Sequence, residues 1–163
     1  NQNDRRTKMK LAVELVPKSS FYNNMRKVLS KDAWDLLRKS VYRKYNYKCG
    51  ICKTKGRMNC HEIWEYDDAR GVQTLKGYIA LCDLCHHVCH IGYASILATK
   101  GKLDYEKVVK HFCKVNKCTR EKFDEHVNKA YKTWKERSKL KWRVDMISYH
   151  QNQNDFITRE VIP

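Results

Sequence analysis

The chain has 163 residues, and its 34 lysines and arginines against 18 aspartates and glutamates give a formal net charge of +16. Hydrophobic residues make up 42% of the chain, enough for a core, and only 6 glycines and 2 prolines exclude collagen-like and low-complexity classes. No apolar run approaches the ~20 residues of a membrane span, and none has the features of a signal peptide. We therefore expect one compact, soluble, mostly helical α+β domain in the cytoplasm, with no membrane partner.

The first elements along the chain are predicted to be an extended segment and two helices. Residues 11–16 are apolar and precede a proline, which predicts a short strand or extended segment. Each helix follows a serine, a residue type that favours the N-cap position. The first covers residues 21–28 after Ser19 or Ser20, and the second covers residues 31–45 after Ser30.

A β-hairpin followed by a helix is predicted for the central part of the chain. Strand-like patterns around residues 58–64 and 74–81 flank a turn at 67–71. From Cys85 to Leu97, histidine and apolar residues recur at helical spacing. Two amphipathic helices follow, one over 105–116 and one that is capped by Thr119 and runs to about Leu140, and a tail over 150–163 shows no clear pattern.

The positive charge is concentrated outside this central part. Residues 1–48 carry +9 and residues 101–163 carry +6, whereas residues 49–100 carry only +1. Basic elements that neutralise phosphates gain affinity by releasing counterions, so a nucleic acid is the expected partner, although any single basic run is more often a solvated helix face. We predict phosphate contacts from Arg38, Lys39, Arg43 and Lys44 and from Lys139, Lys141 and Arg143.

Eight cysteines are present, and six of them lie between residues 49 and 89. Disulfide frameworks belong to short secreted chains, and nothing in this sequence indicates secretion, so metal ligation is favoured. The pairs Cys49-x-x-Cys52 and Cys82-x-x-Cys85 supply four thiolates, the ligand set of a closed structural zinc site. The predicted hairpin fills the interval between the two pairs.

Histidines of the central part suggest a second metal site. His86 and His90 are spaced i, i+4, so they share one helical face, and His61 lies on the first predicted strand. Two neutral imidazoles and one ligand from the hairpin leave coordination positions open for water and phosphate, as in a catalytic metal site.

The combination of Cys49-x-x-Cys52, His61 and Leu81-Cys-Asp-Leu-Cys-His-His-Val-Cys-His90 resembles the zinc-tethered branch of the HNH endonucleases. The run Cys60-His-Glu-Ile-Trp-Glu-Tyr-Asp-Asp68 further resembles a bacterial and phage subgroup of that family. This subgroup is also similar at Leu15–Tyr22 and at Trp134–Ser138, so the resemblance extends over most of the chain.

The resemblance implies a ββα-metal hairpin and helix that hydrolyse phosphodiester bonds in DNA, most often double-stranded. It implies His61 as the general base, with Mg²⁺, Mn²⁺ or another divalent ion held by His86, His90 and Cys60, the residue before the base. In an alternative register, His61 is the ligand and Glu62 takes the position of the base. Both assignments remain open from the sequence.

Two other functions are compatible with the same residues. Cys60 or Cys89 together with a helix histidine would bind a second structural zinc, and the protein would then be an inactive nucleic-acid-binding module on the HNH scaffold. Alternatively, the basic flanks bind an acidic protein surface, and the chain is an interaction factor.

Overall fold

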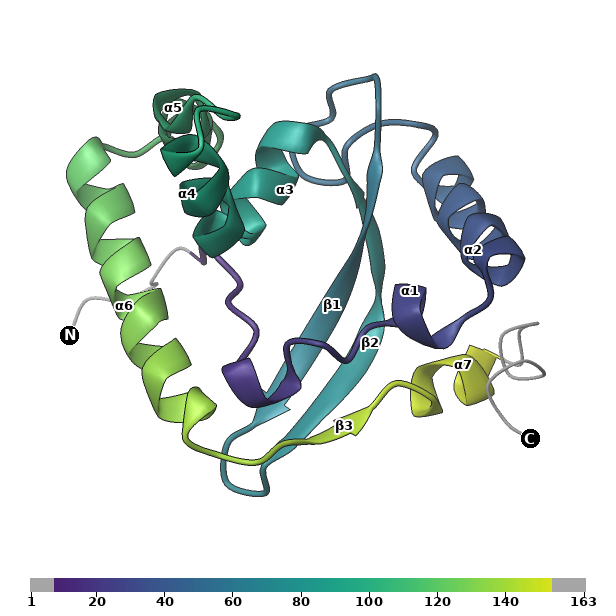
Figure 1. Ribbon diagram of the computed structural model, residues 1–163. Coiled ribbons are helices and arrows are strands. Elements are labelled where there is room, and N and C mark those ends of the chain that lie inside the picture. The colour runs from purple at the N-terminus through teal and green to yellow at the C-terminus, as the bar shows by residue number, and fades with distance from the viewer. Residues whose placement is uncertain (1–7, 154–163) are drawn as a thin grey trace, which may run out of the picture.

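The computed structural model describes residues 8–153, and within them the chain is an α+β protein with a three-stranded sheet and seven α-helices (Figure 1). Residues 154–163 of the predicted tail lie outside the described residues. The elements in chain order are η1 (Lys18–Ser20), α1 (Met25–Val28), α2 (Lys31–Lys44), β1 (Asn59–Asp67), β2 (Val72–Leu81), α3 (Asp83–Cys89), α4 (Ile91–Thr99), α5 (Tyr105–Asn116), α6 (Arg120–Ser138), β3 (Arg143–Asp145) and α7 (Ser148–Gln153).

The predicted hairpin is confirmed and is longer than expected. Strands β1 and β2 pair antiparallel, and Gly71 closes their turn with a φ of 65°, a conformation that favours glycine. The register places His61 opposite Ile79, and an irregularity follows at Ile63 and Trp64. Strand β3 pairs parallel with β2, so β1 remains an edge strand of the sheet.

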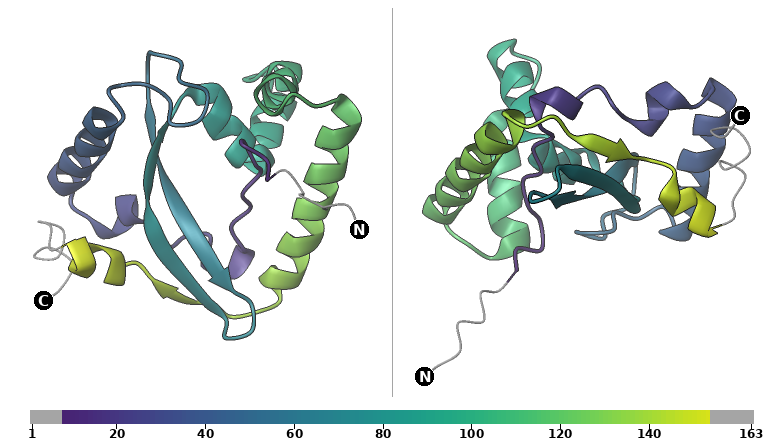
Figure 2. Two further views of the ribbon diagram at one scale, coloured as in Figure 1. Left: turned by 180° about the vertical axis from the view of Figure 1, so that it is seen from behind. Right: turned by 90° about the horizontal axis from the view of Figure 1, so that it is seen from below.

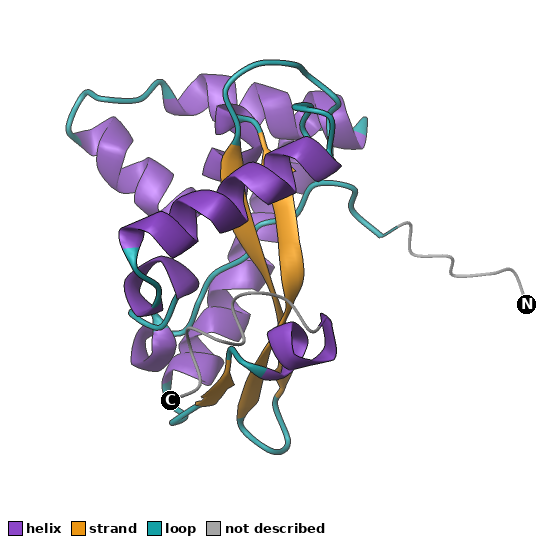
Figure 3. Cartoon of the chain, turned by 90° about the vertical axis from the view of Figure 1, so that its right-hand side faces the viewer, coloured by secondary structure: helices purple, strands orange, loops and turns teal. Residues whose placement is uncertain are grey.

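Helices lie on both sides of the hairpin. Helices α1, α2 and α7 are on one side, and α3, α4, α5 and α6 are on the other (Figure 1, Figure 2). A view turned by 90° shows the two long strands running through the middle, between these helices (Figure 3). The hairpin therefore has two separate faces, and consecutive residues of β1 point toward different groups of helices.

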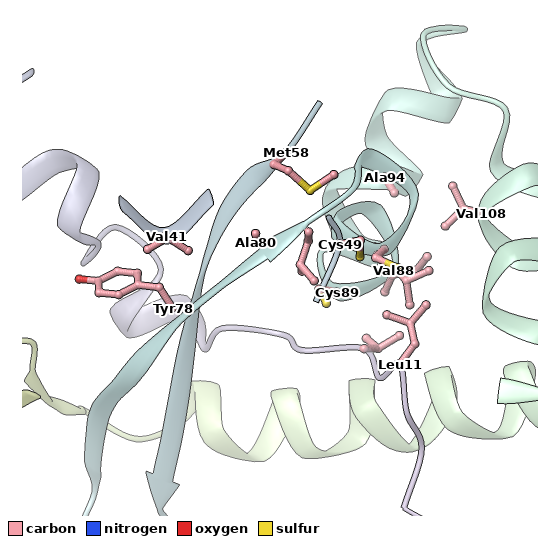
Figure 4. Close-up of a cluster of buried hydrophobic side chains, with 14 of the residues drawn as sticks. Leu11, Val41, Cys49, Met58, Tyr78, Ala80, Val88, Cys89, Ala94 and Val108 are labelled. Atoms are coloured by element: carbon pink, nitrogen blue, oxygen red, sulfur yellow. The ribbon is translucent and has the colours of Figure 1, made fainter. Parts of the chain in front are cut away.

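The buried core joins the hairpin to α3 and α5. Ala80, Val88 and Val108 are fully buried, as is Leu11 from the N-terminal segment (Figure 4). Cys49 and Cys89 belong to the same cluster, so several of the cysteines are part of the core as well as candidate ligands. Among residues 8–153, no helix has the length and apolar character that a membrane crossing requires.

Helix caps were predicted well in the longer helices. Ser30 caps α2 and Thr119 caps α6, since each side chain accepts a backbone N–H of the first turn. Helix α5 has the predicted bounds. The first predicted helix, over residues 21–28, is shorter than expected. The 3-10 helix η1 precedes it, and α1 begins only after Asn24, whose side chain accepts from Lys27 N.

Residues 11–16 form the extended segment that was one of the two predicted possibilities: among the described residues they pair with no strand, and Glu14 N–H donates to Cys89 O. One further prediction needs correction. The helix predicted from Cys85 to Leu97 is broken at His90, whose backbone leaves helical geometry with a φ of −100° and a ψ of 51°. Helical spacing continues across this bend, so the pattern alone gives no sign of it.

Candidate metal centres

The four cysteines of the two Cys-x-x-Cys pairs come together, as predicted. The Sγ atoms of Cys49, Cys52, Cys82 and Cys85 all lie within 4.8 Å of one another. Around the first pair the chain folds into a tight turn, with Cys49 N–H donating to Thr54 O and Lys53 in the left-handed region. Cys82 is the N-cap of α3, and its Sγ accepts from Cys85 N at 3.4 Å.

The electrostatics of this cluster favour a bound cation. Hydrogen bonds from the Cys82 and Cys85 thiols lower the pKa of Cys49, and the hydrogen bond that Cys82 gives to Cys49 raises the pKa of Cys82 to about 11. The four thiols therefore cannot all ionise without a compensating charge. A zinc ion supplies that charge and prefers four thiolates in a tetrahedron, so this donor set fits structural zinc.

A neighbouring histidine links this cysteine cluster to α5. His111 Nε2 lies 3.1 Å from Cys85 Sγ, and burial lowers the pKa of His111. Metal ligands are commonly held in place by hydrogen bonds from surrounding groups. No local pattern signals this role, because Cys85 and His111 belong to different helices.

The three histidines form a second cluster. His61 from β1, His86 from α3 and His90 at the end of α3 each offer a ring nitrogen, and these atoms lie within 4.8 Å of one another. The ring centroid of His61 is 5.6 Å from that of His86 and 5.0 Å from that of His90, and the two helix rings are 4.6 Å apart.

Burial keeps the helix histidines of this cluster neutral. Burial, together with a smaller effect of the neighbouring histidines, lowers the pKa of His86 to about 3 and that of His90 to about 4. Neutral imidazoles are the form that binds a metal, so His86 and His90 are suited to act as ligands at neutral pH. The His61 side chain is 5% exposed.

Glu14 is a site residue that the sequence reasoning did not find. Its Oε2 lies 2.5 Å from His61 Nε2, and Glu14, His61 and Cys89 form a third group of candidate ligand atoms within 4.8 Å. Glu14 precedes the hairpin by many residues and lies in the extended segment at residues 11–16. Only the path of that segment along α3 brings the carboxylate to the cluster.

Cys60 and Glu62 are not brought together with the three histidines. Both lie on the side of β1 that faces α1 and α2: Cys60 is near Tyr42, and Glu62 Oε1 accepts from Met25 N at 3.2 Å. Side chains alternate along a strand, so His61 points the other way. Cys60 is therefore outside the group of three histidines, although it lines the same cleft as they do.

Burial also changes the acidity of these two side chains. It raises the pKa of Cys60 to about 12 and that of Glu62 to about 7. Glu62 Oε2 is buried and finds no hydrogen-bond partner among the described residues. Glu62 is outside the histidine group but lines the same cleft, so its role as the base of the alternative register stays a prediction.

The histidine cluster opens into a large cleft with a volume of about 1410 Å³ along β1. Seven basic and three acidic side chains line it. Of the seven predicted phosphate contacts, only Arg38 is among them; Lys39, Arg43, Lys44, Lys139, Lys141 and Arg143 are exposed elsewhere. The basic residues of the cleft are Arg26, Lys27, Lys31, Arg38, Arg57, Lys129 and Arg137.

Aromatic side chains line the same cleft. Trp34 and Tyr42 come from α2, Trp64 and Tyr66 come from β1, and Trp134 comes from α6. Arg137 stacks over the Tyr66 ring at 4.3 Å and pairs with Asp68 at 2.8 Å, so part of the basic charge is held in place by neighbours. Flat rings and cations together suit a ligand with bases and phosphates.

Comparison of the chain with protein-family models, with curated proteins and with solved structures gives no match in any of the three.

Proposed function

We propose that this protein is a metal-dependent HNH-type endonuclease that hydrolyses phosphodiester bonds in DNA. The observation that carries the proposal is the convergence of three histidines at a cleft lined by seven basic side chains. The cysteine cluster, in this proposal, holds structural zinc and keeps α3 attached to the hairpin. The hairpin and α3 would then form the ββα-metal unit that the sequence resembles.

The donor set of the histidine cluster fits a divalent metal ion. When bound, such an ion supplies positive charge that stabilises the developing charge on phosphorus and on the leaving oxygen. Three imidazoles favour a transition metal such as Mn²⁺, Ni²⁺ or Zn²⁺ over Mg²⁺, which prefers oxygen ligands. We therefore expect Mn²⁺ or Ni²⁺ to support more activity than Mg²⁺.

In this proposal His61 is a metal ligand instead of the general base. Its ring lies with those of His86 and His90, which supports the register in which His61 is a ligand. The competing register makes His61 the general base and leaves the ion to the helix histidines. Substitution His61→Ala separates the two, because loss of a ligand removes the bound ion, whereas loss of a base leaves the ion bound and stops cleavage.

The cleft is the proposed binding site for DNA. Its basic residues come from α1, α2 and α6 as well as from the hairpin region, so they surround the histidine cluster. Each phosphate contact adds affinity that falls steeply with salt. We expect substitution of the cleft cations Arg26 and Lys129 to weaken DNA binding more than substitution of Lys39 and Lys44, which lie outside the cleft.

Cleavage of supercoiled plasmid by zinc-loaded protein tests the proposal directly. With Mn²⁺ or Ni²⁺ added, the wild type is expected to nick or linearise the plasmid, and His86→Ala is expected to lose about 100-fold or more of the rate. The control is His87→Ala, a substitution in the next residue of α3, which belongs to none of the candidate ligand groups. Equal rates for the two variants, or no cleavage of double- or single-stranded DNA with any ion, would overturn the proposal.

One observation favours an inactive alternative. Cys89 lies with Glu14 and His61 in a group that also suits a tightly held zinc ion. A protein that binds two zinc ions tightly, binds DNA and never cleaves it would be a zinc-stabilised binding module. Zinc content after dialysis separates the two functions, since the enzyme retains one tight zinc and exchanges the second ion.

A further inference from the structure

We propose that Glu14 is a positioning residue of the histidine centre: its carboxylate accepts the N–H of one ring nitrogen of His61 and leaves the other nitrogen for the metal ion. This inference rests on the metal centre of the proposed function. It adds to that centre a residue from outside the hairpin and α3, in a segment that enters the site from the N-terminal side.

The contact itself is short and specific. Glu14 Oε2 lies 2.5 Å from His61 Nε2, whereas His61 is buried and the Glu14 side chain is 49% exposed. The buried ring therefore reaches a carboxylate at the edge of the cleft. A carboxylate only accepts hydrogen bonds, so this bond requires a proton on His61 Nε2.

The grouping of ligand atoms separates Glu14 from the metal position. His61 shares one group with His86 and His90, and a different group with Glu14 and Cys89; among the described residues these do not merge into one. Ligand atoms of one tetrahedral ion lie about 3.5 Å apart when the metal bonds are about 2.1 Å. Glu14 thus lies beside His61 and outside the group of three imidazoles, not in place as a fourth ligand.

The hydrogen bond between His61 and Glu14 is of a kind that prepares a histidine for metal binding. A histidine that binds a metal usually donates its other N–H to a carboxylate or carbonyl, which fixes the ring orientation and makes the ligand nitrogen more basic. Among the three histidines of the cluster, His61 is the one with a carboxylate at hydrogen-bonding distance in the described chain. His61 comes from β1, so its ring must also be aligned with His86 and His90, which α3 supplies.

Several hydrogen bonds hold the backbone of the Glu14 segment. Glu14 N–H donates to Cys89 O at 2.9 Å, and Val13 N–H donates to His126 Nε2 at 2.9 Å. On either side, Asn116 exchanges two bonds with Leu11, and the Trp134 indole donates to Val16 O. The segment runs between α6 and the hairpin (Figure 1, Figure 2). A carboxylate on this anchored segment has a defined position.

The contact is a weak source of fold stability. An ion pair with a half-exposed partner typically contributes little, because water competes for the charge. A role in metal binding and a role in folding therefore give different results on substitution. Glu14→Gln keeps the size of the side chain and removes the charge, which makes it the informative variant.

Affinity for Ni²⁺ at the histidine centre, measured by calorimetry on zinc-loaded protein, tests the proposal without reference to cleavage. Glu14→Gln is expected to bind Ni²⁺ 10–100-fold more weakly than the wild type, with zinc content and thermal unfolding unchanged. Glu65→Gln, on the exposed side of β1, is the matched control and should bind Ni²⁺ as the wild type does. A Glu14→Gln protein with wild-type affinity would overturn the proposal.

Nitrogen NMR of the histidine rings gives a second readout. In metal-free wild type, the His61 ring should carry its proton on Nε2, and this preference should weaken in Glu14→Gln. A ring protonated on Nδ1 in the wild type would overturn the proposal. Wild-type protein that binds Ni²⁺ and loses affinity in Glu14→Gln, yet cleaves no DNA, would support Glu14 and reject the nuclease function.

Discussion

The two ligand clusters differ in where their side chains come from and in what surrounds them. Each Cys-x-x-Cys pair is a local turn, and the four thiols face one another with two of them buried. The histidines come from a strand and a helix, and they line a cleft. A closed set of thiolates leaves no room for a substrate, whereas neutral imidazoles at a cleft do. In the proposed function, the first cluster would serve folding and the second would serve chemistry.

The sharpest test of this comparison is to remove one ligand from each cluster. Cys82→Ser is expected to lose zinc and cooperative thermal unfolding, because the binding free energy of a structural zinc, roughly 10–16 kcal/mol in small zinc modules, is also folding free energy. His90→Ala is expected to keep both zinc and a cooperative transition. Circular dichroism during heating, together with zinc analysis, measures the difference. If Cys82→Ser unfolded as the wild type does, the cysteine cluster would not be structural.

Substitution of Glu62 tests whether the metal centre formed by the histidines is confined to one face of β1. The Glu62 pKa of about 7 means that the folded protein keeps a proton which the unfolded chain releases near pH 4.5. The contribution of this carboxyl to the free energy of unfolding is therefore fully present below pH 4.5 and is lost as pH rises through 7. Glu62→Gln stays neutral, so it should be more stable than the wild type at pH 8 by about 1–3 kcal/mol.

Urea unfolding at pH 5 and at pH 8 measures this effect. The stabilisation should shrink toward zero at pH 5, and Ni²⁺ binding should be unchanged at both values. The exposed Glu65→Gln should show no such dependence on pH. A loss of Ni²⁺ affinity in Glu62→Gln would show that the centre reaches across the strand.

A smaller effect is expected where α5 contacts the cysteine cluster. Removing the ring in His111→Ala deletes the group 3.1 Å from Cys85 Sγ and should weaken zinc binding about 10-fold while leaving the fold intact. Competition with a chromophoric chelator measures the change. His87→Ala should leave zinc affinity unaltered, and an equal loss in both variants would argue against a specific bond to Cys85.

Much of the fold follows from local signals in the sequence. The caps at Ser30 and Thr119, the bounds of α5 and the two Cys-x-x-Cys turns are each encoded by residues close together in the chain. The grouping of His61 with the helix histidines needs only the hairpin and α3. These features are predictable because few residues decide them.

Other features depend on distant parts of the chain. Glu14 reaches His61 only because the N-terminal segment crosses α3, and no periodicity signals that path. The side of β1 on which Glu62 lies depends on strand register and on the position of α1. The cations of the cleft likewise come from helices whose packing decides which basic residues face inward.

Helix α3 is only 7 residues long, and the cysteine and histidine clusters both depend on it. Isolated helices shorter than ~12–15 residues are marginal in water, so this one needs support at its ends. Cys82 and Cys85 support the first turn of α3, and the bend at His90 ends its last turn. If the thiols hold zinc, as proposed, the spacing of His86 and His90 would be established only after that ion has bound. The two metals would load in a fixed order, and zinc supply during synthesis would set the fraction of molecules able to acquire the second ion.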